Sequence, residues 1–202
     1  MQLFFTRHGE SQANIERIIS NRDLPHALTA RGRAQAAALA ERLANRQIVT
    51  IYTSPILRAQ ETGQIVAARL QVPLLINAAL REWDCGNMEG RGDEAAWAAH
   101  SKAVAAWAKG DWAHCIPGGE SFIDMQARFV PFVQQLLTQD AHCDNAILLI
   151  GHGSLLYHML PMVLANVDTA FIDARGMPNC VLIETTVRAG QLVCRAWEAD
   201  QL

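Results

Sequence analysis

The sequence predicts an α/β fold of three layers, in which helices cover both faces of a mostly parallel central sheet. Short β-branched and apolar runs alternate with alanine-rich stretches along the chain, which is typical of this architecture. Half of the 202 residues are hydrophobic, and only 18% are charged, so the chain can bury a core and is neither disordered nor fibrous. We expect a single domain over residues 1–202.

Six apolar runs are predicted to form the strands of this sheet. The first follows directly from the N-terminus and ends before Thr6-Arg7-His8, and the fourth ends before Gly151-His152-Gly153. Each run is short and is followed by polar, glycine or proline residues that end a strand. The predicted strands lie near 2–6, 48–52, 73–76, 146–150, 180–187 and 191–197.

Five stretches between these strands are predicted to form helices. Thr29 is a suitable N-cap for the first, which is rich in alanine, and Pro55 suits the first turn of the second. Ser121, with Asp124 three residues later, begins another helix after the turn Pro117-Gly118-Gly119. The predicted helices lie at 29–45, 55–70, 92–109, 121–138 and 153–165.

Residues 83–120 differ from the rest of the chain. They follow a predicted strand, contain a helix with no strand of their own, and are expected to form a lid-like insertion. The segment carries four of the five tryptophans, which either line a substrate cleft or pack in the core; the tendency of aromatic residues to be buried favours the core. These tryptophans are Trp83, Trp97, Trp107 and Trp112.

Charge and composition restrict the kinds of partner and the cellular compartment that we expect for this chain. The chain has 17 basic and 20 acidic residues, a balance that argues against nucleic-acid binding. The apolar runs are too short for a secretory signal or a membrane span, so we expect a cytoplasmic protein. The cysteines are widely spaced without a CxxC pair and are expected to be reduced thiols. They are Cys85, Cys115, Cys143, Cys180 and Cys194.

Polar residues follow four of the predicted strands. Ligands of open parallel sheets bind beyond the carboxyl ends of the strands, so these side chains are expected at one edge. Arginine binds phosphoryl oxygens bidentately, helix N-termini favour anions, and imidazole can attack phosphorus. No Walker loop, GxGxxG, HExxH or Cys/His cluster is present, so we predict phosphoryl chemistry without metal or cofactor. The residues after the strands are Arg7 and His8, then Ser54 and Arg58, then Glu82, then His152 and Gly153.

Four ordered motifs resemble those of the histidine phosphatase superfamily, also called the phosphoglycerate mutase-like family. The similarity covers almost the whole chain, and Gly86, Glu89-Gly90 and Gly118–Ser121 fall where that family has further motifs. The four motifs are Thr6–Ser11 with Asn14, Ser54–Thr62, Leu80–Glu82 and Gly151–Gly153.

The resemblance implies that His8 is a nucleophile that becomes phosphohistidine. Cations around the phosphoryl group stabilise the charge of its transition state, which suits such a site. The side chains implied to hold the phosphate, together with the Gly153 amide, are Arg7, Asn14, Arg58 and His152.

Glu82 matches the family's proton donor, which protonates the leaving alcohol and then deprotonates the attacking water. Asp84 lies two residues further on and is the alternative donor. Glu10 is expected to hold its loop and to take no part in proton transfer. The histidines outside the motifs are expected to be structural or exposed, with His26 a loop contact near the pocket; the others are His100, His114, His142 and His158.

Departures from the family pattern concern substrate fit. Ser20 replaces a longer amide side chain, and Cys85 and Met88 replace aromatic residues. The cations of residues 83–120 are few, which favours a small phosphate monoester with an uncharged or aromatic leaving group, and a hydrolase over a mutase. The alternative functions are a phosphoglycerate-type mutase and a catalytically idle phosphate-binding module. For the oligomeric state, we expect either a monomer or a homodimer. The cations of this segment are Arg91, Lys102 and Lys109.

Overall fold

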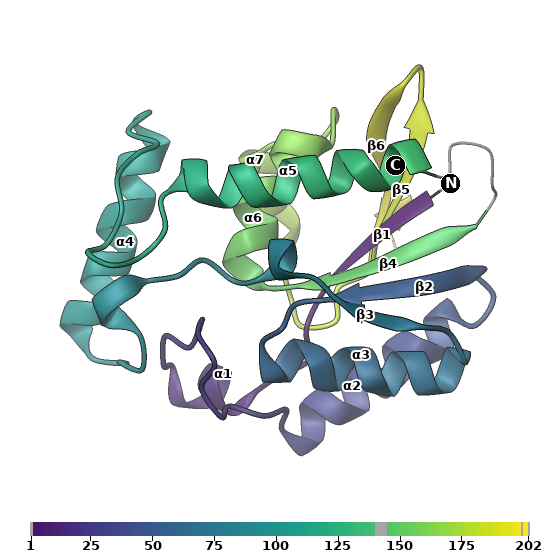
Figure 1. Cartoon of the computed structure of the whole chain (residues 1–202), viewed down its shortest axis with the longest axis horizontal. Coiled ribbons are helices and arrows are strands. Elements are labelled where there is room, and N and C mark those ends of the chain that lie inside the picture. The colour runs from purple at the N-terminus through teal and green to yellow at the C-terminus, as the bar shows by residue number, and fades with distance from the viewer. Residues whose placement is uncertain (1, 140–144, 199, 202) are drawn as a thin grey trace.

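The computed structural model describes residues 2–139, 145–198 and 200–201. Its sheet has the parallel strands at one side and an antiparallel edge at the other, with helices on both faces (Figure 1). The predicted three-layer α/β fold is thereby confirmed. In order across the sheet, the strands are β3 (Leu74–Ile76), β2 (Ile48–Thr53), β4 (Ala146–Gly151), β1 (Gln2–Arg7), β5 (Ile183–Arg188), β6 (Gln191–Trp197) and β7 (Asp200–Gln201).

Side chains of the central strands alternate between two buried clusters, one on each face of the sheet. Leu3 and Phe5 of β1 pack with one set of helices, while Phe4 packs with the other, as the period of two in a strand requires. The first face is covered by α5 (Phe122–Gln139), α6 (Gly153–Val163) and α7 (Thr169–Arg175). The second face is covered by α2 (Ala30–Leu43) and α3 (Leu57–Leu70).

The five predicted helices and six predicted strands are all present, with one strand shortened at its start. The strand expected from residue 180 begins at Ile183, because Cys180 has a positive φ of 57° that interrupts extended backbone. Elements that the sequence did not indicate are short: α1 (Gln12–Glu16), α7, β7, and two 3₁₀ helices at Ala78–Leu80 and Gly86–Met88.

Two further features bear on the composition arguments. Within the described ranges, no helix is long and apolar enough to cross a bilayer. The described cysteines are free thiols, three of them buried, while Cys143 lies outside the described residues.

The 83–120 segment packs its helix α4 (Glu94–Ala108) beyond one end of the sheet (Figure 1). Trp83 and Trp107 are buried against each other with ring centroids 4.5 Å apart, so the core prediction is correct for these two. Trp97 is only partly buried, and Trp112 is 44% exposed, so the core prediction is wrong for Trp112. Trp112 lies beyond the C-terminal end of α4, where its ring centroid is 4.6 Å from that of Phe122 and its side chain remains partly open to solvent.

His158 of α6 lies where the 83–120 segment meets the main core. Its ring packs edge-on against Trp107 and Tyr157, with centroids 5.1 and 5.0 Å away, and is 9% exposed. Burial, with a smaller contribution from His100, lowers the pKa of His158 to about 4. The imidazole is therefore a neutral part of the packing at pH 7.

The loop after β1 lies directly against α2. A Cβ atom on Gly32 would come within 1.9 Å of the Glu10 carbonyl oxygen, and one on Gly9 within 2.5 Å of the Gly32 carbonyl oxygen. This close backbone contact fixes the position, relative to α2, of the residues that follow β1, which include His8.

We expect the stability advantage of the wild type over His158→Phe to shrink as the pH falls from 6.5 to 4. The folded pKa lies below the unfolded value, so the unfolded chain binds the extra proton in this window, and the wild type loses about 1.4 kcal/mol per pH unit relative to the variant. Urea unfolding of both proteins at several pH values measures this difference. A difference that does not change with pH would contradict the buried neutral state of His158.

We expect Gly32→Ala to destabilise the fold by about 1–3 kcal/mol, because the new methyl group overlaps the Glu10 carbonyl. Helix propensity alone predicts the opposite sign, since alanine is favoured over glycine in a helix by about 1 kcal/mol. The free energy of unfolding in urea separates the two. An unchanged or increased value would show that the loop after β1 does not lie this close to α2.

Candidate active site

A cavity of about 540 Å³ lies beyond the carboxyl ends of the parallel strands. It collects six of the seven predicted site residues, and the seventh, His152, is fully buried beside His8 with ring centroids 5.1 Å apart. The topology therefore brings the strand-end residues to one place, as expected. The six that line the cavity are Arg7, His8, Asn14, Arg58, Glu82 and Gly153.

His8 is held in one tautomer by two hydrogen bonds. Its Nδ1 lies 2.6 Å from the Gly9 carbonyl oxygen, which can only accept, so Nδ1 carries the proton. Its Nε2 accepts a hydrogen bond from Arg58 Nε at 2.9 Å and therefore presents a lone pair. Burial, followed by the charges of Arg58 and Arg7, holds the pKa of His8 well below its usual value. His8 is thus a neutral imidazole with an unprotonated Nε2.

Arg58 stands in the first turn of α3 and is 4% exposed. Its Nη1 donates to the Ser20 carbonyl oxygen at 2.5 Å, and burial lowers its pKa to about 10, so the guanidinium stays charged at neutral pH. Ser20 Oγ also lies 2.7 Å from His26 Nδ1, which places His26 as a loop contact beside the pocket. Of the three departures from the family pattern, Ser20 is the one that lines the cavity; Cys85 and Met88 do not.

Arg7, at the end of β1, lies against the start of α6. Its Nη1 donates to the Met177 carbonyl oxygen at 2.7 Å, while its buried Nε has no partner among the described residues. A Cβ atom on Gly153 would be 3.4 Å from the guanidinium carbon, so a glycine lets the helix end approach this cation closely. Arg7 therefore keeps an N–H donor for a ligand.

His152 contacts Ser54 through one of its ring nitrogens. Its Nε2 lies 2.7 Å from Ser54 Oγ, which also accepts the Ile56 N–H; where the Ser54 hydroxyl donates to Nε2, the imidazole proton is on Nδ1. Nδ1 is buried with no partner in the described part of the chain. Burial and the charge of Arg58 hold the pKa of His152 well below its usual value. Arg7 Nε and His152 Nδ1 are thus two buried nitrogens close to His8 that lack a partner in the described ranges.

Asn14 lines the cavity, and an unpredicted residue, Asn179, contacts Asn14 and His8 from outside the lining. Asn14 Oδ1 accepts hydrogen bonds from the Ser11 amide and, at 3.4 Å, from Asn179 Nδ2, which leaves the Asn14 amide group for the cavity. Asn179 Nδ2 also donates to the His8 carbonyl oxygen at 2.9 Å. Asn179 lies in a loop outside all four motifs, where no sequence pattern indicates a site residue.

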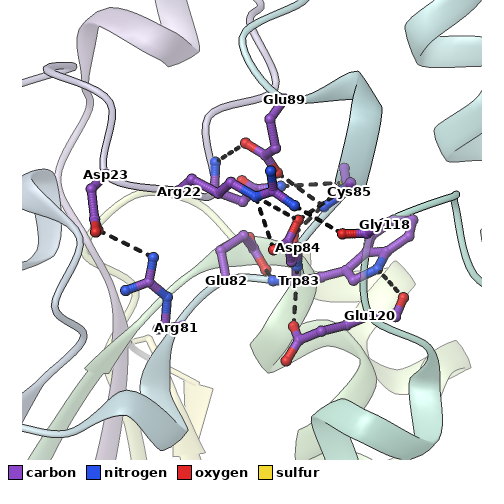
Figure 2. Close-up of polar contacts among 12 residues, drawn as sticks. Arg22, Asp23, Arg81, Glu82, Trp83, Asp84, Cys85, Glu89, Gly118 and Glu120 are labelled. Atoms are coloured by element: carbon purple, nitrogen blue, oxygen red, sulfur yellow. Dashed lines mark hydrogen bonds and ion pairs between the residues drawn. The ribbon is translucent and has the colours of Figure 1, made fainter.

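The two candidate proton donors occupy different environments. Glu82 is buried and accepts from the amides of Ser154 at 2.9 Å and Leu155 at 2.7 Å, so its carboxylate caps α6 at the wall of the cavity. Asp84 instead pairs with Arg22 at 3.0 Å (Figure 2) and accepts the Gly86 N–H, and it does not line the cavity. The geometry therefore favours Glu82 over Asp84.

The opposite end of the cavity is aromatic and uncharged. His100 of α4 lies between Trp83 and Trp97, with centroids 4.8 and 5.3 Å away, and lines the cavity, a position that its sequence context did not indicate. Burial lowers the pKa of His100. Met177 also lines the cavity and was not among the residues predicted from the sequence. None of the three cations of the 83–120 segment lines the cavity. Arg91 pairs with Asp93, and Lys102 and Lys109 are exposed.

The other predicted roles can also be placed. Glu10 accepts from Thr29 Oγ1 at 2.8 Å and lies outside the cavity lining, which fits a loop-holding role. His114 Nδ1 lies 3.7 Å from Asp111 Oδ2, and neither residue lines the cavity. His142 lies outside the described residues. In the described ranges, no three His, Cys, Asp or Glu side chains form a group that could hold a metal ion.

Comparison with known proteins identifies relatives across the whole length. The chain is 34% identical to the adenosylcobalamin/alpha-ribazole phosphatase of Escherichia coli over 89% of this chain and 87% of that one. It is 32% identical to "Probable phosphoglycerate mutase GpmB" of Proteus mirabilis over 98% and 90% of the two chains. A mycobacterial glucosyl-3-phosphoglycerate phosphatase solved with VO3 superposes with a TM-score of 0.80 at 26% identity, covering 98% and 99%.

A family model matches residues 3–200, nearly the full length of the chain. The match agrees with the four strand-end motifs and with the cavity that they form. This protein belongs to the histidine phosphatase superfamily, branch 1.

Proposed function

We propose that this protein hydrolyses a small phosphate monoester without a metal ion, through a phosphohistidine on His8 Nε2. The observation that carries the proposal is the unprotonated Nε2 of His8 beside two buried nitrogens that lack a partner in the described ranges, Arg7 Nε and His152 Nδ1. Cations and N–H groups fixed before the substrate arrives stabilise phosphoryl charge at little reorganisation cost. Phosphatases among the relatives support a phosphoric monoester hydrolase.

In the first step, the His8 Nε2 lone pair attacks phosphorus and the ester P–O bond breaks. The Arg58 Nε–H, which Nε2 accepts in the free protein, transfers its hydrogen bond to a phosphoryl oxygen. The leaving oxygen takes the electron pair, and Glu82 in its protonated form gives it a proton. In the second step, the Glu82 carboxylate takes a proton from water, water oxygen bonds to phosphorus, and the P–N bond breaks. The products are an alcohol and inorganic phosphate, with His8 and Glu82 restored.

The far end of the cavity favours hydrolysis of a monophosphate over mutase chemistry. A bisphosphorylated intermediate needs cations for its second phosphate. Beyond Arg7 and Arg58, the lining in the described ranges contains no lysine or arginine, and its outer part is Trp97, His100 and Val104. We therefore propose an uncharged leaving group.

We expect His8→Ala to lower kcat for p-nitrophenyl phosphate by at least about a thousandfold, because it removes the imidazole whose unprotonated Nε2 lies against Arg58. Activity of the wild type should persist with EDTA. His114→Ala, away from the cavity, serves as the control and should match the wild type. Turnover by His8→Ala, or loss of wild-type activity in EDTA, would overturn the proposal.

The alternatives are separated by the fate of the phosphoryl group. Wild-type protein that forms phosphohistidine and passes it to a second hydroxyl of phosphoglycerate, without releasing phosphate, would be a mutase. Protein that binds phosphate but neither labels His8 nor turns over any monoester would be an idle binding module.

We expect Glu82→Gln to impair poor leaving groups more than good ones. Loss of the acid should cost about 10²–10⁴ in kcat/KM, which reports the step that forms phosphohistidine, with an alkyl phosphate and much less with p-nitrophenyl phosphate, whose leaving oxygen needs no proton. Asp84→Asn is the matched control, since Asp84 holds Arg22 outside the cavity, and it should change both substrates by the same factor. A leaving-group dependence in Asp84→Asn would assign the acid to Asp84. The absence of such a dependence in both variants would assign it to neither.

A further inference from the structure

We propose that a second cavity, adjoining the aromatic end of the catalytic one, binds the distal apolar part of the substrate's leaving group. The enzyme would then prefer phosphate monoesters whose leaving group is long, uncharged and aromatic. This preference presupposes the proposed hydrolase activity and specifies its substrate class.

The two cavities are neighbours that share part of their walls. The catalytic cavity of about 540 Å³ and the second, of about 320 Å³, are both lined by Val104, Tyr157 and His158. Val104 comes from α4 and the other two from α6, so the partition lies where the 83–120 segment meets the main fold. Trp97, His100, Val104 and Ala108 follow one another at helical spacing on α4, the first three at the catalytic cavity and the last two at the second, so a leaving group lying along α4 extends from one cavity toward the other.

The second cavity is suited to an apolar aromatic group. None of the described residues that line it is Asp, Glu, Lys or Arg. Trp112 and Met162 contribute to it although they are 44% and 40% exposed, so a bound ring would cover apolar surface that now faces water. Its lining beyond the partition is Trp107, Ala108, Trp112, Phe122, Pro161, Met162 and Thr169.

The partition is built before any ligand binds. Tyr157 is anchored by a hydrogen bond from its hydroxyl to Asp173 Oδ1 at 2.9 Å, and the His158 ring is packed edge-on against Trp107. His158 is neutral at pH 7, because burial lowers its pKa to about 4. A rigid, uncharged wall favours a flat, uncharged ligand, since little ordering is needed on binding.

The test compares phenyl phosphate with 4-phenylphenyl phosphate, which differ by one ring beyond the reacting oxygen. We expect wild-type kcat/KM to be about tenfold higher or more for the longer substrate, as burial of a second ring predicts. Ala108→Trp, on the exposed rim of the second cavity, should remove this preference and leave phenyl phosphate within about twofold of wild type. Ala105→Trp, exposed on the same helix but lining neither cavity, should keep the preference.

The outcomes distinguish this inference from the proposed function. No turnover of phenyl phosphate by the wild type would overturn both. Turnover of phenyl phosphate with no preference for the longer substrate, an unchanged preference in Ala108→Trp, or an equal loss in Ala105→Trp would overturn the second cavity's role alone. If Ala108→Trp loses phenyl phosphate turnover, Met162→Trp fills the same cavity from α6 and must abolish the preference.

Discussion

The site depends first on the hydrogen bond between His8 Nδ1 and the Gly9 carbonyl oxygen, 2.6 Å long. This bond places the imidazole proton on Nδ1 and leaves the Nε2 lone pair facing Arg58. Without it, a histidine between two guanidinium groups could turn or present Nε2–H, which cannot attack phosphorus. Asn179 holds the His8 carbonyl, and the contact of Gly9 with α2 holds the loop, so distant segments converge on one ring orientation.

The start of α6 serves two purposes in the same few residues. Its amides at Ser154 and Leu155 hold the Glu82 carboxylate, and Gly153 lets the helix end lie against the Arg7 guanidinium. The positive end of the helix dipole and Arg7 together favour negative charge at this wall of the cavity. Glu82 and Arg7 are therefore positioned by one element. A displacement of α6 would disturb both.

Sequence reasoning located the part of the site that topology controls. Arg7, His8, Arg58, Glu82 and His152 each follow a strand, and parallel strands must bring such residues to one edge. It could not locate Asn179, Met177 or His100, whose positions depend on how a loop and the 83–120 segment fold back over the edge. Likewise, α1 and α7 contain only 5 and 7 residues, too few for a hydrophobic period to be recognised. The environments of Glu82 and Asp84 differ only in three dimensions, because both carboxylates follow the same strand.

The most direct measurement of the central claim is the protonation state of the His8 ring. Long-range ¹H–¹⁵N NMR of the free enzyme, with the His8 signals assigned by comparison with His8→Ala, reports which nitrogen is protonated. We predict a neutral ring with Nδ1–H and an unprotonated Nε2 at pH 7, and the same state at pH 6, below the usual pKa of histidine. An imidazolium at pH 6, or a neutral ring with the proton on Nε2, would contradict the account.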